Sequence, residues 1–285
     1  MSVVGGEVPQ AKQEINDCIF DRKICSSPNE INLMRKFLTE LSIQVPKSDR
    51  EVVEILKKEL KVANESQIWE SRQFKEFVGS STADTILKKI FKPIGPSNST
   101  ALLDNFNIDE TMEQWSLNGK DLFGKKFYHI PYQMIDFALV QSKLARTTLW
   151  DMIHRNYDCF GVVLNTDISS GRGKHWFCLY GDFKHAGTKE DPYTLEYFNS
   201  SGNPPMNEVE IWLQKSVHDL LRDHKKYCEI VRSAPQRLQY SGTECGVWSL
   251  LYIYSRLQNH APNWFYKVRA DDNDMIKMRA QFFRK

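Results

Sequence analysis

Cys245 is the cysteine of this chain whose sequence setting best suits a nucleophile. It stands where the polar segment SGTE gives way to the apolar run GVWSLLYIYSRL, so we expect it in the first turn of a helix. The unpaired N–H groups and the positive dipole end of a helix N-terminus stabilise a thiolate and lower the pKa of a cysteine. The same position also suits a small buried side chain. The role of Cys245 therefore depends on its partners.

Two polar residues at the ends of predicted strands could serve as those partners. His175 follows the turn SSGRGK and opens the run HWFCLYG, and its imidazole could take the thiol proton and return one to a leaving amine. Asn199 ends the next run, YTLEYFN, and its amide oxygen could orient the imidazole. Each residue also has an ordinary explanation, as a surface or core histidine and as a turn residue. If the two strands pair, their ends bring His175 and Asn199 together.

Gln239 precedes Cys245 by six residues, with a glycine-containing loop between them. Its side-chain amide and the backbone N–H of Cys245 could together hold the oxyanion of a tetrahedral intermediate. Gln236 is a competing candidate by composition. The spacing alone does not decide between them.

The elements that would carry these residues fall into two groups. Residues 1–94 read as an all-α arm, because helix caps precede apolar positions at helical spacing. The caps are Ser27 with Glu30, Ser48 with Glu51, then Asn64 and Ser81, and Gly79 should end the third helix. The segment FKPIGPSNST (91–100) is typical of a connection, so we place the boundary there.

Residues 95–285 are predicted to form a second domain that combines strands and helices, an α+β or mixed α/β class. Aromatic and β-branched runs predict neighbouring strands, helical spacing predicts an amphipathic helix, and an apolar run predicts a buried helix. The strands are expected at 159–165, 175–181, 193–199 and 228–232, and the helices at 207–221 and 246–257.

Charge and composition exclude several classes of function. The formal net charge is only +2, so the strong basic field that nucleic-acid binding needs is not expected. No apolar run approaches a membrane span and the first residues do not resemble a signal peptide, so we expect a protein that acts inside a cell. In that setting the six cysteines are expected as free thiols.

A metal site is the first alternative, because His175 and Cys178 are close in sequence. The chain has no C-x2-C pair, and on a strand these two side chains would point to opposite faces, so neither a metal nor another cofactor is predicted. A binding module that keeps only a protease fold is the second alternative. The presence of all four candidate residues argues against it.

The motifs GKHW, EYFN and Q-x5-C-G, in this order, resemble the adenain and Ulp1/SUMO-protease clan of cysteine peptidases. The segments NFNIDET (105–111), VLNTD (163–167), GRGKHW (171–176), EYFNSSGN (196–203) and TECG (243–246) resemble more closely the polyprotein-processing proteases of African swine fever virus. SUMO proteases usually carry Asp where this chain has Asn199.

The resemblance implies a papain-like α+β core with the nucleophile on a central helix. It implies Cys245 as nucleophile, His175 as general base and acid, Asn199 as orienting residue and Gln239 as oxyanion donor. It also implies cleavage after Gly-Gly, with Trp176 over the substrate groove; a core aromatic is the ordinary reading of that tryptophan.

The function that follows from the resemblance is a cysteine endopeptidase. It would cleave viral structural polyproteins after Gly-Gly during virion maturation, in the host cytoplasm and in the virion. The alternative is an isopeptidase that removes SUMO or another ubiquitin-like protein from its conjugates, since both reactions attack a carbonyl after Gly-Gly.

Overall fold

The computed structural model describes residues 17–20, 22–96, 98, 100–233 and 235–285, which divide into two compact units. The helical unit contains the described residues up to Gly95 together with Ala280–Lys285, and the core unit runs from Pro96 to Arg279. The six C-terminal residues, which the sequence assigned to the core, are thus grouped with the helical unit. No helix of the described residues has the length and apolar character that crossing a membrane requires.

The described residues of the helical unit form the helices α1 (Pro28–Glu40), α2 (Asp49–Leu60), α3 (Glu65–Glu70), α4 (Arg72–Val78) and α5 (Ser80–Ile90). The predicted starts at Ser27 and Ser48 are confirmed, and Ser27 and Glu30 form a capping box. One helix was expected between Asn64 and Gly79. It is broken at Ser71, which is extended and whose hydroxyl accepts a hydrogen bond from the Phe74 N–H, so a second helix begins there.

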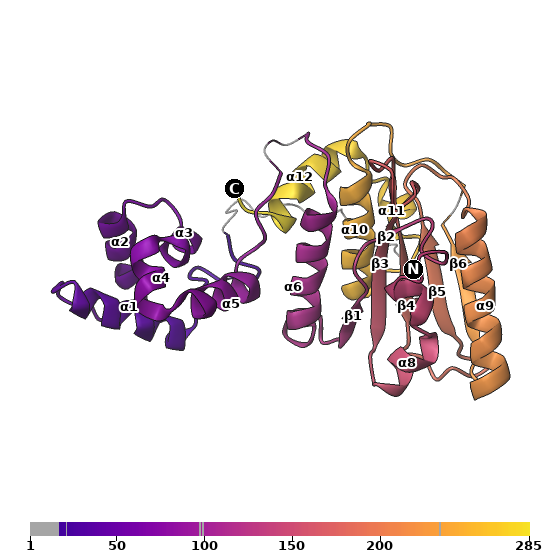
Figure 1. Cartoon of the computed structure of the whole chain (residues 1–285), viewed down its shortest axis with the longest axis horizontal. Coiled ribbons are helices and arrows are strands. Elements are labelled where there is room, and N and C mark those ends of the chain that lie inside the picture. Colours follow the sequence, from indigo (N-terminus) through magenta and orange to yellow (C-terminus); the bar gives the residue numbers. More distant parts are fainter. Residues whose placement is uncertain (1–16, 21, 97, 99, 234) are drawn as a thin grey trace, which may run out of the picture. The chain divides into compact units, whose positions relative to one another are not determined.

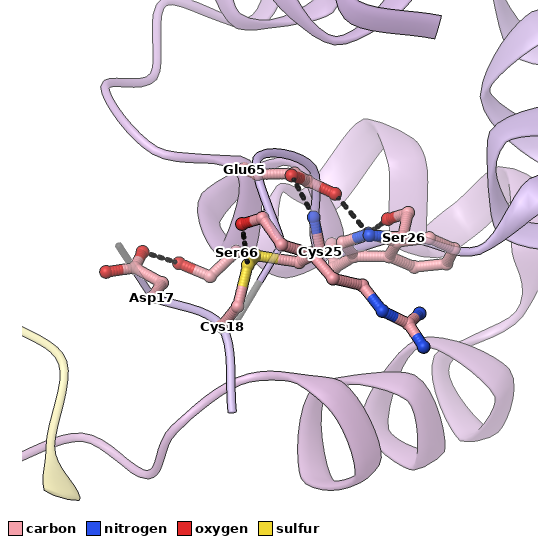
Figure 2. Close-up of a disulfide and its surroundings, with 8 residues drawn as sticks. Asp17, Cys18, Cys25, Ser26, Glu65 and Ser66 are labelled. Atoms are coloured by element: carbon pink, nitrogen blue, oxygen red, sulfur yellow. Dashed lines mark hydrogen bonds between the residues drawn. A yellow bond between two sulfur atoms is a disulfide. The ribbon is translucent and has the colours of Figure 1, made fainter. Parts of the chain in front are cut away.

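A disulfide in the helical unit corrects the expectation of six free thiols. Cys18 and Cys25 are bonded, with their Cα atoms 5.2 Å apart. The carboxylate of Glu65 accepts the N–H groups of Cys25 and Ser26 at 2.9 and 2.8 Å, which holds the Cys25 end of the bridge in place (Figure 2). Chain composition could not reveal this bridge, because it depends on local backbone geometry.

The core unit is built on a mixed sheet that has six strands among the described residues. They are β1 (Phe127–His129), β2 (Gln133–Met134), β3 (Cys159–Asn165), β4 (Trp176–Asp182), β5 (Tyr193–Phe198) and β6 (Cys228–Arg232). The order is β1-β3-β4-β5-β6, and β2 also pairs with β3. Strands β3, β4 and β5 are antiparallel neighbours, so the predicted pairing of the HWFCLYG and YTLEYFN strands is confirmed.

Helices cover both faces of this sheet, as Figure 1 shows for α9 on one face and for α6 and α10 on the other. The remaining bounds are α6 (Asn105–Phe123), α7 (Lys143–Arg146), α8 (Leu149–His154), α9 (Asn207–His224), α10 (Cys245–Leu257), α11 (Trp264–Val268) and α12 (Asp272–Phe282). Phe160, Val162 and Leu179 belong to the core beneath α9, with Trp212 and Leu213. The α+β class is confirmed, and so is the buried helix, whose residues are almost all inaccessible.

The α10 face of the sheet contains a desolvated ion pair. Glu196 on β5 is fully buried, and its carboxylate accepts hydrogen bonds from Arg256 Nε and from the Tyr252 hydroxyl of α10, at 2.8 and 2.9 Å. A second guanidinium nitrogen of Arg256 donates to the same carboxylate at 2.8 Å. This bidentate pair fixes the position of α10 along the strand, because a charge so deeply buried must keep its partner.

We therefore expect Arg256→Met to lower the free energy of unfolding by about 3–5 kcal/mol, because it leaves the Glu196 charge buried without its counter-charge. Urea titration measures the change. The matched control is Arg232→Met, whose pair with Glu210 is solvent-exposed and should matter by less than about 1 kcal/mol. Equal losses in the two variants would contradict this account of α10.

Candidate active site

Cys245 is the first residue of α10 and is almost fully buried. Its sulfur accepts hydrogen bonds from backbone N–H groups, those of Trp176 and Gly246 and its own. The contact with Trp176 is a contact between two elements, because Trp176 begins β4 and follows His175 directly. It places the thiol of α10 at the strand end where His175 lies.

The pKa of Cys245 is shifted in the direction opposite to the one that the sequence predicts. Burial raises the pKa above its usual value, and the backbone N–H groups only partly offset this, while the charge of Glu244 adds to the rise. A helix N-terminus was expected to lower the pKa. Desolvation is the larger effect, because the start of α10 lies inside the protein and not at its surface. The thiol is therefore protonated at neutral pH.

The backbone donors still distinguish Cys245 from the other free thiols of the described residues. Burial raises the pKa of Cys159 and of Cys228 to about 12, and that of Cys178 well above its usual value. Among the described residues, no backbone N–H group contributes to the pKa shift of these three thiols. An anion on Cys245 would be stabilised by backbone N–H donors, whereas the hydrogen bond that lowers the pKa of Cys159 comes from the Tyr180 hydroxyl.

His175 and Asn199 are brought together as their strand ends predicted. Nε2 of His175 lies 2.8 Å from Oδ1 of Asn199. An amide oxygen can only accept, so Nε2 carries the proton and Nδ1 is left with the lone pair of a base. Burial lowers the pKa of His175, and the bond to Asn199 raises it by a smaller amount. The resting imidazole is neutral.

The amide of Asn199 is held by two neighbours that the sequence did not single out. Its Oδ1 accepts hydrogen bonds from the backbone N–H and the hydroxyl of Ser201, at 3.0 and 2.8 Å. Its Nδ2 donates to the Tyr197 hydroxyl at 3.0 Å. These contacts fix which end of the amide faces His175. The only sequence signal was proximity, since both partners lie within two residues of Asn199.

The turn before His175 is shaped by Asn165 and two glycines. Oδ1 of Asn165 accepts the Lys174 N–H at 2.9 Å, and the Thr166 N–H donates to the carbonyl of His175 at 2.9 Å. Gly173 has φ +87°, a conformation that L side chains rarely adopt. A Cβ on Gly171 would lie 2.3 Å from Oδ2 of Asp167. The GRGK sequence therefore serves to present His175.

Gln239 is buried beside the residue that follows Asn199, whereas its competitor Gln236 is exposed. Its Oε1 accepts the hydroxyl proton of Ser200 at 2.7 Å, and its Nε2 donates to the carbonyl of Ser241 at 2.8 Å. An amide nitrogen has two protons, so one N–H remains for another acceptor. Burial and hydrogen bonding thus favour Gln239 over Gln236 as the candidate oxyanion donor, a choice that composition left open.

The indole of Trp176 is held in place by one hydrogen bond and one aromatic contact. Its indole N–H donates to the carbonyl of Leu103 at 3.0 Å, and its ring meets the ring of Tyr132 edge-on at 6.2 Å. The same Leu103 lies against the start of α10, where a Cβ on Gly246 would come within 3.0 Å of the Leu103 Cβ. Trp176 is therefore a fixed wall beside Cys245.

Helix α12 braces the segment between Gln239 and Cys245, which the sequence did not indicate. The carboxylate of Asp272 accepts the N–H groups of Tyr240 and Ser241, both at 2.7 Å, and the indole N–H of Trp248 at 3.0 Å. Arg279 forms a buried ion pair with Glu244 at 2.9 Å. The loop is thereby held at both of its ends.

Among the described residues no cluster of three or more His, Cys, Asp or Glu side chains is placed to hold a metal ion. The groups that meet at this site are a thiol, a neutral imidazole and two amides. Together they can transfer a proton and stabilise charge around one nucleophile.

Relatives of the chain are viral proteases. It is 36% identical over 211 residues to a protein of African swine fever virus named SUMO-1 cysteine protease, covering 70% of this chain and 73% of that one. It is 22% identical over 230 residues to a protein of Acanthamoeba polyphaga mimivirus named as a thiol protease, covering 73% and 65%. No protein-family model matches the chain.

A solved structure agrees with these relatives. The crystal structure of the African swine fever virus pS273R protease superposes with a TM-score of 0.72 at 29% identity, over 95% of this chain and 96% of that one. The fold and the relatives define a cysteine protease of the SUMO-protease type. The chain belongs to the family of the African swine fever virus pS273R cysteine protease.

The pKa shifts predict a broad pH profile for kcat/KM. Burial keeps the pKa of His175 below 6.5, so the imidazole can still accept a proton as the pH falls to that value. Burial keeps the pKa of Cys245 above 9.0, so the pair loses its shared proton only above that value. Initial rates from about pH 4 to about pH 10 should show a plateau between limbs that lie outside these two values.

The rate of thiol alkylation reports the protonation state of Cys245 and His175 in the absence of substrate. The rate at which iodoacetamide modifies Cys245 should still be rising at pH 9.0, because the thiol is protonated below its raised pKa. The Cys245→Ala variant gives the background from other thiols. A rate that has already levelled off near about pH 5 would contradict the prediction, since it would reveal a thiolate–imidazolium pair.

Proposed function

We propose that this protease is an endopeptidase that cleaves viral structural polyproteins after Gly-Gly, with Cys245, His175 and Asn199 as its catalytic triad. The observation that carries the proposal is the joint placement of these groups. The imidazole of His175 is bonded to Asn199, and the thiol of Cys245 contacts the amide of the residue next to that histidine. The two contacts come from three separate elements, so chance proximity in sequence does not explain them.

The proposed reaction begins with the neutral pair. Nδ1 of His175 takes the thiol proton as the sulfur of Cys245 attacks the scissile carbonyl carbon, and the carbonyl oxygen becomes an oxyanion. The Cys245 N–H and the remaining N–H of Gln239 donate to that oxyanion. As the intermediate collapses, the imidazolium protonates the leaving amine and a thioester remains. His175 then activates a water that hydrolyses the thioester and releases the thiol.

The positive charge that forms on His175 is the reason for Asn199. The Asn199 oxygen accepts the Nε2 proton throughout, which keeps the ring oriented and stabilises the imidazolium. A neutral amide does this more weakly than a carboxylate would. The depressed pKa of His175 fits that weaker support.

The preference for Gly-Gly is proposed from the fixed wall beside the nucleophile. Trp176 is tied to Leu103 and Tyr132 and cannot move aside easily. Residues without side chains pass such a wall most readily, because a Cβ on the substrate would meet the indole. Trp176 is therefore proposed as the substrate-contacting residue of the site.

Deconjugation is the second candidate, because the African swine fever virus relative is named a SUMO-1 cysteine protease. The same triad would cleave the bond between a Gly-Gly terminus and a lysine. We favour polyprotein cleavage on the viral relatives, and we place the enzyme in the host cytoplasm and in the virion, where structural polyproteins are processed.

Substitutions of the triad should separate three roles. Cys245→Ala should abolish turnover, and His175→Ala should lower kcat by about 10²–10⁴-fold, because the general base is lost. Asn199→Ala should leave measurable activity, because orientation does not consume a proton. Asn199→Asp should keep activity and raise the pKa of the acid limb, because a carboxylate favours the imidazolium. Progress curves on one Gly-Gly peptide measure all four.

As a control, the thermal unfolding midpoint of each variant is measured to show that the variant is folded. Full activity of Cys245→Ala would refute the nucleophile. An Asn199→Asp variant whose acid limb moves downward would refute the orientation of His175 by Asn199.

The substrate class is tested with two substrates at equal concentration. We expect cleavage of a peptide with an internal Gly-Gly-Xaa sequence, with kcat/KM at least about tenfold above that for a lysine conjugate of SUMO or ubiquitin. A peptide with Ala-Ala in place of Gly-Gly is the matched control and should not be cleaved. Rapid release of the folded conjugate without peptide cleavage would favour deconjugation instead.

A further inference from the structure

We propose that Ser200 is a positioning residue for catalysis, which holds and polarises the Gln239 amide so that its remaining N–H meets the oxyanion. The inference rests on the proposed function. Ser200 would connect the segment that carries Asn199 to the proposed oxyanion donor Gln239. Ser200 follows Asn199 directly and is almost fully buried. It touches Gln239 through both its side chain and its backbone.

The hydroxyl of Ser200 determines what the Gln239 carbonyl end can do. Oε1 of Gln239 accepts the Ser200 proton at 2.7 Å, while Nε2 donates to the Ser241 carbonyl at 2.8 Å. Because a backbone carbonyl only accepts, Nε2 must face Ser241, and Oε1 must then face Ser200. Without the hydroxyl, a buried carbonyl oxygen would have no donor and the side chain would turn to find one.

The backbone of Ser200 fixes where the glutamine begins. Its carbonyl accepts the N–H groups of Leu238 and Gln239 at 2.9 and 3.0 Å. These bonds tie the loop that precedes Cys245 to the end of β5. Asn199, at the same end of β5, binds His175. The proposed general base and the proposed oxyanion donor are therefore positioned by two adjacent residues, Asn199 and Ser200.

The Ser200 bond also strengthens the donor. A hydrogen bond received by an amide oxygen draws electron density from the amide nitrogen and makes its N–H a better donor, so bonds in such a chain reinforce one another. In this site the series of hydrogen bonds would lead from the Ser200 hydroxyl through the Gln239 amide to the oxyanion. Among the described residues, the hydrogen bond of Gln239 Nε2 goes to the Ser241 carbonyl, which leaves its second proton for another acceptor. That proton is therefore available to the substrate.

If Ser200 acts by positioning Gln239, removing the Ser200 hydroxyl should lower kcat only while Gln239 is present. In the 285-residue chain, Gln239→Ala should lower kcat by about 10²-fold or more, and Ser200→Ala by about tenfold, each with KM changed by less than about twofold. Both variants should weaken inhibition by a Gly-Gly peptide aldehyde, whose adduct with Cys245 carries the oxyanion. In the Gln239→Ala background, Ser200→Ala should change kcat by less than about twofold.

The matched control is Ser255→Ala, which removes an equally buried serine hydroxyl that donates to the Tyr252 carbonyl within α10. It should leave kcat within about twofold of the wild type. If Ser200→Ala does not fold, Ser200→Cys keeps the side-chain volume with a weaker donor and carries the same expectation.

The outcomes distinguish this inference from the proposed function. A Ser200 effect of equal size with and without Gln239 would overturn the inference, because the serine would then act through the fold alone. A normal kcat in Gln239→Ala, with an inactive Cys245→Ala, would also overturn it while leaving the nucleophile in place. Activity in Cys245→Ala would instead refute the proposed function itself.

Discussion

The buried ion pair between Glu196 and Arg256 is the interaction on which the site geometry depends. It ties the C-terminal end of α10 to the middle of β5, and the Tyr252 hydroxyl, one turn earlier in α10, adds a third hydrogen bond to the same carboxylate. A helix that is apolar nearly all round has no preferred height along a sheet, since dispersion contacts are not directional. One directional, desolvated pair sets that height. Cys245 at the start of α10 then falls opposite the start of β4.

The antiparallel pairing of β4 with β5 supplies the second half of the geometry. Because Cys178 pairs with Phe198, the start of β4 and the end of β5 lie at the same edge of the sheet. His175 and Asn199 extend from those two ends and meet. The site is thus built where a helix start and two strand ends converge, and its groups share one rigid frame.

Burial gives this site its electrostatic character. It raises the pKa of Cys245 and lowers that of His175, so both shifts favour the uncharged pair. In the proposed mechanism, charge appears only when the substrate carbonyl is attacked, and the groups proposed to stabilise it are backbone N–H donors and the amides of Asn199 and Gln239. Neutral partners suit a site of this kind, because a permanent carboxylate would hold the imidazolium before substrate arrives. The Glu244 charge beside the thiol is balanced by Arg279.

The sequence by itself determined the elements and the candidate residues. The strand containing Trp176–Asp182, the following strand and the buried helix after Cys245 are local patterns of apolar residues, which chain periodicity records. The helix-start motif at Ser27 was likewise readable, because a cap involves residues within one turn.

Only the tertiary structure decided which of the candidates meet and in what state. The choice of Gln239 over Gln236 depends on burial, and the direction of the Cys245 pKa shift depends on desolvation by distant elements. The Cys18–Cys25 bridge and the brace by Asp272 depend on backbone positions that neither composition nor spacing encodes. The physical reason is common to all of them. Residue type and spacing report what a side chain can do, whereas dielectric surroundings and hydrogen-bond partners come from residues far away in the chain.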